Sequence, residues 1–145
     1  MIVVSDTSPI INLAAVGQLE LLHKLYDEIA IPQAVYHEIV VIGAGQPGAT
    51  EVEGFEWIKK QQVVNQTLVA SLKLELDPGE AEAIALATEL PANLLLLDER
   101  RRRLIASRLG LKVIGILGLM VEAKHRGFVS TVKPIMNDLI SKAGF

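Results

Sequence analysis

Short apolar runs alternate with longer amphipathic stretches along the chain. Strands are predicted at residues 2–5, 29–31, 94–97 and 112–114, and an edge strand within residues 57–64. Helices are predicted at residues 10–16, 19–26, 32–41, 77–90, 99–109, 117–126 and 132–142, and the glycine-rich stretch 43–54 is predicted to be a loop. Strands that alternate with helices are typical of parallel βαβ units. We therefore expect a three-layer α/β/α fold with a central, mainly parallel, Rossmann-like sheet.

Two of the predicted helices begin with clear start signals. Ser8 and Pro9 are typical of a helix N-cap followed by a first helical residue. Asp77 precedes Pro78 in the same way, and Glu80 follows three residues after Asp77, which is the spacing of a capping box. These signals predict that Ser8 and Asp77 cap their helices.

The length and composition favour one domain that covers residues 1–145. Half of the 145 residues are apolar, so the chain can bury a core and is not disordered. No apolar stretch reaches the roughly 18 residues needed to span a membrane, and the N-terminus lacks the basic flank of a signal peptide. The chain has no cysteine, which excludes disulfides and thiolate metal sites. We expect a soluble, cytoplasmic protein.

Charge is unevenly distributed along the chain, although the net charge is only −3. Residues 1–72 carry a net charge of −5 and residues 73–145 a net charge of +2. The basic residues concentrate at Arg100–Arg103, a patch that is able to bind phosphate even on an acidic protein. A solvated helix face explains the same run equally well.

Two apolar runs end at an aspartate and are followed by a helix. Asp6 ends the first run and Asp98 ends the run at residues 94–97. Ligands bind at the carboxyl edge of an open parallel sheet, so these two residues could share one site despite their separation in sequence. Each also has a structural explanation, because Asp6 could be a turn residue and Asp98 could cap the helix predicted from residue 99.

Two glutamates are further candidates. Glu80 lies on the same helix face as Ile84 and Ala87, so it should look inward, although it could equally serve only to close the capping box on Asp77. Glu38 lies within the helix predicted at residues 32–41 and, taken alone, fits a solvated position. Carboxylates that gather on one sheet edge repel one another unless a cation separates them, and oxygen ligands suit Mg²⁺ or Mn²⁺.

Three polar residues stand close to Asp6 in sequence. Thr7 and Ser8 offer hydroxyls beside it, and Asn12 lies one turn into the first helix. Asn12 could orient Asp6 or bind substrate, or it could be a tolerated polar residue. None of the three histidines has the spacing of metal ligands, and we assign them no catalytic role.

Taken together, these segments resemble the PIN domain, a nuclease family that includes the VapC-type toxins of bacterial toxin–antitoxin pairs. The resemblance covers most of the chain and lies in the residues around Asp6 and Asn12, in 35–38, in 79–87 and in 97–101. The stretches 113–118 and 123–127 are similar to one branch of the family, known mostly as predicted nucleic-acid-binding proteins of prokaryotes. Relatives in that branch often carry a glycine within the basic run, where Arg102 stands here.

The resemblance implies a Mg²⁺- or Mn²⁺-dependent endoribonuclease that hydrolyses RNA phosphodiester bonds with a metal-activated water. It implies a site of four metal-holding, catalytic carboxylates: Asp6, Glu38, Glu80 and Asp98. The residues expected to bind substrate are Thr7, Ser8, Asn12, Arg100 and Arg101. Whether one or two ions bind is left open. The third acid is often aspartate in the wider family, so Glu80 places the same group on a longer arm.

Two other enzyme classes and one non-catalytic function are alternatives to this interpretation. A phosphatase of the haloacid dehalogenase type needs a second aspartate where Ser8 stands. A receiver domain needs an acidic neighbour for Asp6 and a lysine where Gly115 stands. The main alternative is a PIN-like module that only binds RNA or a protein.

Three expectations concern partners. An antitoxin partner stays open, because the sequence holds no record of a neighbouring gene. A homodimer is expected, since half of the composition is apolar and exposed helices such as residues 117–121 could pair. RNA recognition through shape or backbone is favoured, because few aromatic residues are present to stack bases.

Overall fold

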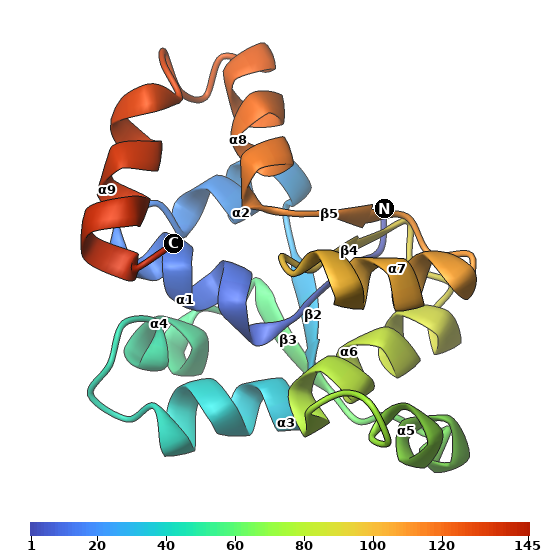
Figure 1. The fold of residues 1–145 in the computed structure, drawn as a ribbon. Helices are drawn as coiled ribbons and strands as arrows, with labels where there is room; N and C mark the ends of the chain where they lie inside the picture. The colour runs from blue at the N-terminus through green and yellow to red at the C-terminus, as the bar shows by residue number, and fades with distance from the viewer.

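The chain folds around a five-stranded parallel sheet in the computed structural model, which describes residues 1–100 and 102–145. The strands are β1 (Val3–Ser5), β2 (Ile29–Pro32), β3 (Ile58–Gln61), β4 (Leu94–Leu96) and β5 (Val113–Ile114). Their order in the sheet is β3-β2-β1-β4-β5, and every neighbouring pair is parallel (Figure 1). The predicted α/β fold with a parallel central sheet is therefore confirmed, including the edge strand β3.

Helices connect the strands and cover both faces of the sheet. The helices before β4 are α1 (Thr7–Ala15), α2 (Glu20–Tyr26), α3 (Gln33–Tyr36), the π-helix η1 (His37–Ile42), α4 (Ala49–Gly54), α5 (Gln66–Leu72) and α6 (Pro78–Glu89). Those after β4 are α7 (Arg100–Arg108), α8 (Ile116–His125) and α9 (Lys133–Ala143). No helix in the described residues is both long and apolar enough to cross a membrane.

The sheet separates two apolar cores. Val3 packs with α1, α2, α8 and α9, whereas the next residue, Val4, packs with α5, α6 and α7. Leu94 and Leu95 of β4 divide in the same way, because successive side chains of a strand point to opposite faces. In Figure 1 α1 and α9 lie to the left of the strands, and α5, α6 and α7 lie to the right. Burial on both faces explains why these strands are continuously apolar.

The strand order reverses between β1 and β4. The chain moves outward from β1 through β2 to β3, and then returns to place β4 on the other side of β1. In open α/β sheets, ligands bind in the crevice that forms at the carboxyl ends of the strands at such a point. The residues that follow β1 and β4 therefore lie where this architecture provides a site.

Two helices occur where the sequence analysis predicted none. α4 lies within the stretch predicted as a loop, and its first turn is closed by Glu51, whose side chain accepts a hydrogen bond from the Gly48 amide at 3.1 Å. α5 begins after Asn65, whose side-chain oxygen accepts a hydrogen bond from the Leu68 amide at 3.1 Å. Both helices are short and capped by polar contacts, so the hydrophobic period that marks longer helices is too brief to detect.

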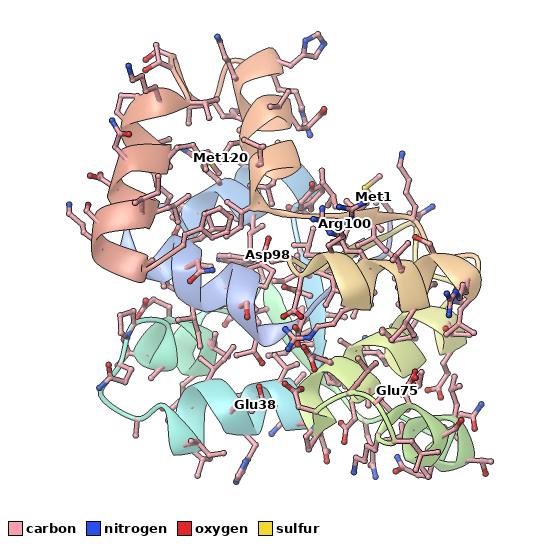
Figure 2. The ribbon with its side chains drawn as sticks, viewed as in Figure 1. Met1, Glu38, Glu75, Asp98, Arg100 and Met120 are labelled. Carbon is pink, nitrogen blue, oxygen red and sulfur yellow. The ribbon has the colours of Figure 1, made fainter. Side chains whose placement is uncertain are left out.

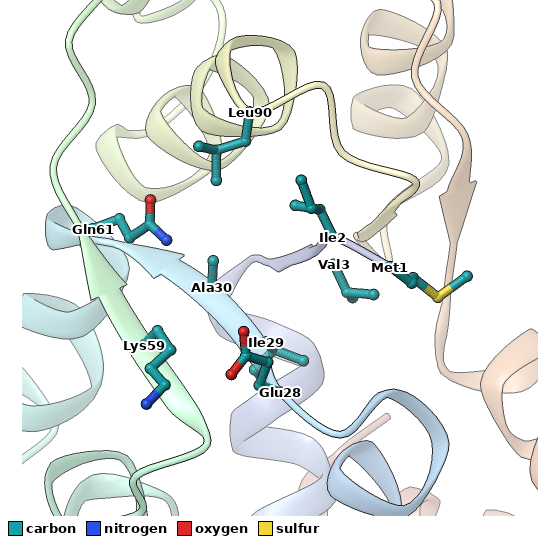
Figure 3. Close-up of a pocket in the computed structure, with 9 residues that line it drawn as sticks. All are labelled: Met1, Ile2, Val3, Glu28, Ile29, Ala30, Lys59, Gln61 and Leu90. Atoms are coloured by element: carbon teal, nitrogen blue, oxygen red, sulfur yellow. The ribbon is translucent and has the colours of Figure 1, made fainter.

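One pocket lies away from the switch point. It is formed by residues at the beginning of β1 and β2, by β3 and by the end of α6 (Figure 3). Its lining is mainly apolar, with Glu28 and Lys59 as the only acid and base among its described residues. None of the carboxylates singled out in the sequence contributes to it, so it is no part of the candidate site.

Candidate active site

Asp6 is buried directly after β1. Its backbone amide donates a hydrogen bond to the Leu96 carbonyl at 3.0 Å, which extends the pairing of β1 with β4 by one residue. The side chain is only 4% exposed, and its Oδ1 atom has no hydrogen-bond partner among the described residues. Burial raises the pKa of Asp6 to about 7, the Thr7 backbone amide opposes the rise, and nearby carboxylates, Glu80 first, add to it.

Asp6, not Ser8, occupies the N-cap position of α1. The helix begins at Thr7, so Ser8 is its second residue, and the predicted capping role of Ser8 is wrong. The Asp6 side chain makes no capping hydrogen bond either. Its carboxylate is therefore available for another partner. It lies at the N-terminus of α1, where the free backbone amides favour negative charge.

Asp98 also lies at the carboxyl edge of the sheet, two residues after β4. Its Oδ1 atom accepts a hydrogen bond from the amide of Ile116, the first residue of α8, at 2.7 Å. The alternative in which Asp98 caps the helix after it is not observed, since Glu99 holds the N-cap position of α7. The Oδ2 atom is buried and has no hydrogen-bond partner in the described part of the chain. Burial raises the pKa of Asp98, while the Ile116 hydrogen bond and the charge of Arg103 oppose the rise.

Glu80 uses its two oxygen atoms differently. The predicted capping box is present: the Asp77 amide donates to Oε1 of Glu80 at 3.0 Å, and the Glu80 amide donates to Oδ1 of Asp77 at 2.9 Å. Oε2 of Glu80 instead contacts Nε of Arg102. The side chain is 3% exposed, and burial is the main cause that raises the pKa of Glu80 to about 7. Capping and an inward-facing carboxylate, which the sequence left as alternatives, are therefore both present.

Glu38 joins the beginnings of two helices. Its Oε2 atom accepts a hydrogen bond from the Thr7 hydroxyl at 2.6 Å, and its Oε1 atom accepts one from the Gly79 amide at 3.1 Å. A Cβ atom on Gly79 would lie only 2.5 Å from Oε1 of Glu38, so a larger residue here would push the carboxylate out of this position. Glu38 is half-buried rather than solvated, and the Gly43 amide closes a π-type turn on its carbonyl at 2.9 Å.

A cleft at the switch point brings several of the predicted site residues together. Its described lining consists of Asp6, Ser8, Asn12, Asp98, Glu99, Arg102, Ala143, Gly144 and Phe145. Figure 2 shows Asp98 between α1 and α7, and Glu38 on the segment that continues α3. Glu80 reaches the edge of the cleft through its contact with Arg102, and Thr7 is engaged with Glu38. Arg100 is exposed at the start of α7 outside the lining, and Arg101 lies outside the described residues.

The lining includes residues that the sequence analysis did not assign to the site. The sequence analysis identified Arg102 only as a member of the basic run Arg100–Arg103. Nothing in that run indicates that one of its arginines contacts carboxylates. The end of α9 and the residues after it reach the cleft because α9 packs against α1. Nothing near Phe145 in the sequence indicates this position, since the contact joins opposite ends of the chain.

The donor set fits a hard divalent cation at Asp6 and Asp98. Both line the same cleft, and each has a buried carboxylate oxygen without a hydrogen-bond partner in the described chain. Leaving such an oxygen unpaired costs free energy, which a bound cation would recover. Among the described residues, no three acidic or histidine side chains are arranged around one ion position. Glu80 is engaged by Arg102 and Glu38 by Thr7 and Gly79, so the four predicted ligands do not meet at one point.

Comparison with known families now identifies the domain. A family model described as the PIN domain matches residues 2–145. The chain belongs to the PIN-domain family. PIN domains have a nuclease-type fold and typically use divalent metals, which agrees with the oxygen-rich cleft between β1 and β4.

A solved structure supports the same fold. The PIN-domain chain is similar to a PilT N-terminus domain protein from the hyperthermophilic archaeon Sulfolobus solfataricus P2, with a TM-score of 0.64 and 21% sequence identity. The similarity covers 85% of this chain and 93% of that protein. At this identity the likeness shows the fold alone. No curated protein matches the sequence of the chain.

Proposed function

We propose that this PIN-domain chain is a Mg²⁺- or Mn²⁺-dependent endoribonuclease that hydrolyses RNA phosphodiester bonds. The observation that supports it most is the pair of buried, unpartnered oxygens of Asp6 and Asp98 in one cleft at the switch point. Each of the two carboxylates keeps one buried oxygen without a donor, which a bound cation would satisfy, and oxygen ligands favour Mg²⁺ and Mn²⁺. The PIN-domain fold and the position of the cleft agree with this assignment.

Asp6 and Asp98 would hold the metal directly, with Glu80 at the edge of the cleft. When bound, the ion would supply an activated water and stabilise the leaving oxygen of the phosphodiester. Glu38 is a positioning residue in this proposal, because it accepts hydrogen bonds from Thr7 and from Gly79. Thr7 directly follows Asp6 in the chain, and Gly79 directly precedes Glu80.

The substrate would contact donors on both sides of the acidic residues. Ser8 and Asn12 line the cleft, and their hydroxyl and amide groups can donate to phosphate oxygens. Arg100 is exposed beside the cleft, on the helix that follows Asp98, and would attract the RNA backbone. Arg101 is assigned the same role from its place in the basic run.

The first experiment measures metal-dependent cleavage. The purified chain is incubated with a mixed single-stranded RNA pool and Mn²⁺ or Mg²⁺, with a single-stranded DNA pool of the same sequences in parallel. We expect RNA fragments that are absent with EDTA and with Asp6→Asn. The matched control is Asp27→Asn, which makes the same chemical change at an exposed residue after α2. This variant should keep the activity of the unaltered protein.

The result also decides between the candidate functions. RNA binding without cleavage, unchanged in Asp6→Asn, would reject the nuclease proposal and favour a non-catalytic RNA- or protein-binding module. Cleavage of DNA alone would reject the substrate assignment. A role as the toxin of a toxin–antitoxin pair is a separate proposal, tested by growth arrest on expression and its relief by the product of an adjacent gene.

A further inference from the structure

Arg102 is the cation already present at the acidic cleft. It extends from the first turns of α7 and lines the cleft together with Asp6 and Asp98. Its Nε atom contacts Oε2 of Glu80, and one terminal guanidinium nitrogen lies 2.6 Å from Oε2 of Glu99. Its side chain is 31% exposed, so the guanidinium is held largely within the protein. The planar fork of arginine is well suited to such a shared position between carboxylates.

The contact with Glu80 uses the one oxygen that this residue has available. Oε1 of Glu80 accepts the hydrogen bond from the Asp77 amide, so only Oε2 faces Arg102. A metal ion that took Oε2 as a ligand would have to replace the guanidinium or sit beside it, against the repulsion of two positive charges. Because the side chain of Glu80 is 3% exposed, water would screen this repulsion poorly.

The remaining charge matches one divalent ion. Arg102 contacts both Glu80 and Glu99 and shares its positive charge between them, while Asp6 and Asp98 carry two further negative charges when ionised. Three buried carboxylate oxygens accept no hydrogen bond in the described chain, one each on Asp6, Glu80 and Asp98. Arg102 contacts the one on Glu80, so only those of Asp6 and Asp98 have neither a donor nor a cation beside them. Arg103 approaches Asp98 from the Gly115 side, where Oδ1 already accepts the Ile116 amide, and it does not line the cleft.

A second ion would lack ligands in this arrangement. In two-metal sites the ions lie about 3.5–4 Å apart and share carboxylate ligands. Both oxygens of Glu38 accept hydrogen bonds, from Thr7 and Gly79, and Glu80 is engaged by Asp77 and Arg102. Among the buried carboxylates of the described residues, only Asp6 and Asp98 therefore keep an oxygen that neither a donor nor the Arg102 guanidinium contacts.

We propose that Arg102 is a built-in counter-cation that takes the place of a second metal, so that the cleft holds one divalent ion, bound by Asp6 and Asp98. The proposal rests on the proposed function in that it requires a metal to bind at all. It assigns Arg102 a positioning role, since the residue acts through Glu80 and sets how many ions the acidic residues can hold.

The test counts bound Mn²⁺ and is independent of cleavage. Metal-free protein is titrated with Mn²⁺, and free ion is followed by its electron paramagnetic resonance signal. We expect one ion for the unaltered protein and two for Arg102→Gln, in which Oε2 of Glu80 loses its cation. Arg102→Lys keeps the charge and should bind one ion. The matched control is Arg108→Gln, which removes the same charge from the exposed end of α7 and should also bind one.

The result distinguishes a failure of the role proposed for Arg102 from a failure of the proposed nuclease function. Two ions on the unaltered protein, or one ion on a folded Arg102→Gln variant, would overturn the role of Arg102. No bound Mn²⁺ on any form would instead overturn the proposed metal nuclease. If Arg102→Gln gives no cooperative thermal unfolding, the unaltered protein still tests the number of bound ions. At saturating Mn²⁺ its electron paramagnetic resonance spectrum shows dipolar coupling only when two ions lie close together, and we expect no dipolar coupling.

Discussion

At the scale of single residues, the site depends on carboxylates that the fold buries without supplying enough donors. Asp6 has an oxygen with no hydrogen-bond partner among the described residues, whereas Glu38 has a donor for each of its oxygens. Burial makes the charged form of Asp6 costly, and this is the main reason that its pKa rises to about 7. A protein does not gain stability from such a residue, so its presence is better explained by a partner that it binds.

This cost predicts how the stability of the metal-free protein depends on pH. The pKa of Asp6 is about 7 in the folded state and 3.8 as its ordinary value. Between about pH 4 and 7, the Asp6 carboxyl is therefore protonated in the folded state and ionised in the unfolded state. The stability that protonated Asp6 contributes is full below about pH 4 and is lost as the pH rises through 7. We expect the melting temperature in EDTA to fall between pH 4 and 8, and to fall less in Asp6→Asn.

Thermal melts of both forms across this range test the prediction. Glu80 also has a pKa raised to about 7, so some of the decline should persist in the variant. An equal decline in the two proteins would show that Asp6 is not buried as a costly acid. Asp27→Asn serves as the control, and it should follow the unaltered protein at every pH.

At the scale of elements, the acidic residues are placed by contacts between helix ends. The π-helix η1 presents Glu38 to the first turn of α1 and to the first turn of α6. π-type turns are uncommon and are frequent at functional sites, because the extra residue shifts the direction of a side chain. Hydrophobic periodicity in the sequence predicted one continuous helix over residues 32–41 and could not show this change.

The close approach of α6 to η1 makes Gly79 sensitive to substitution. In Gly79→Ala, a Cβ atom would meet the carboxylate of Glu38 at 2.5–2.9 Å, so this carboxylate has to shift and loses its hydrogen bond from the residue 79 amide. Losing a hydrogen bond to a charged group typically costs about 1.5–3 kcal/mol. We expect a loss of this size in urea denaturation, and weaker Mn²⁺ binding because the shift would be transmitted to Asp6 through Thr7.

A matched glycine controls for the change in backbone entropy. Gly54 ends α4, and a Cβ atom there has no heavy atom within 4 Å. Gly54→Ala should leave stability and Mn²⁺ binding nearly unchanged. A Gly79→Ala variant as stable as Gly54→Ala would contradict the tight contact between Gly79 and Glu38.

At the scale of the whole molecule, one end of the chain lies against the other. The residues after α9 line the same cleft as Asp6, because α9 packs along α1. One side of α8 is exposed. Leu117 and Val121 are each 57% exposed and lie one turn apart on α8, which makes an apolar stripe on the outer surface.

The homodimer expected from the sequence stays a prediction, and the exposed stripe is the face through which we propose that it forms. We expect light scattering after size-exclusion chromatography to give about twice the mass of the chain, and the Leu117→Lys, Val121→Lys double variant to give the mass of one chain. Two lysines at exposed positions should not affect folding, which circular dichroism would check. A monomeric unaltered protein, or a dimer that survives the double variant, would rule out pairing through this face.

The sequence by itself determined the strands, the longer helices and several of the residues at their ends, but not α4, α5 or the π-helix η1. Apolar runs that stop at Asp6 and Asp98, and the capping box of Asp77 and Glu80, are local patterns, because strand burial and helix capping depend on near neighbours in the chain. The same patterns predicted the parallel sheet and led to the PIN-domain family. The helix starts at Ser8 and Asp98 were displaced by one or two residues, since several polar residues there could serve as caps.

Only the tertiary structure decided which of these residues meet. The neighbours of β1 are set by packing on both faces of the sheet, and that order brings Asp6 and Asp98 into one cleft. The contact of Arg102 with Glu80 and the position of Phe145 join residues far apart in the chain. No local pattern encodes such contacts, because they arise from the arrangement of whole helices. The sequence therefore identified the acids, and the fold determined which of them hold a donor, a guanidinium or a free oxygen.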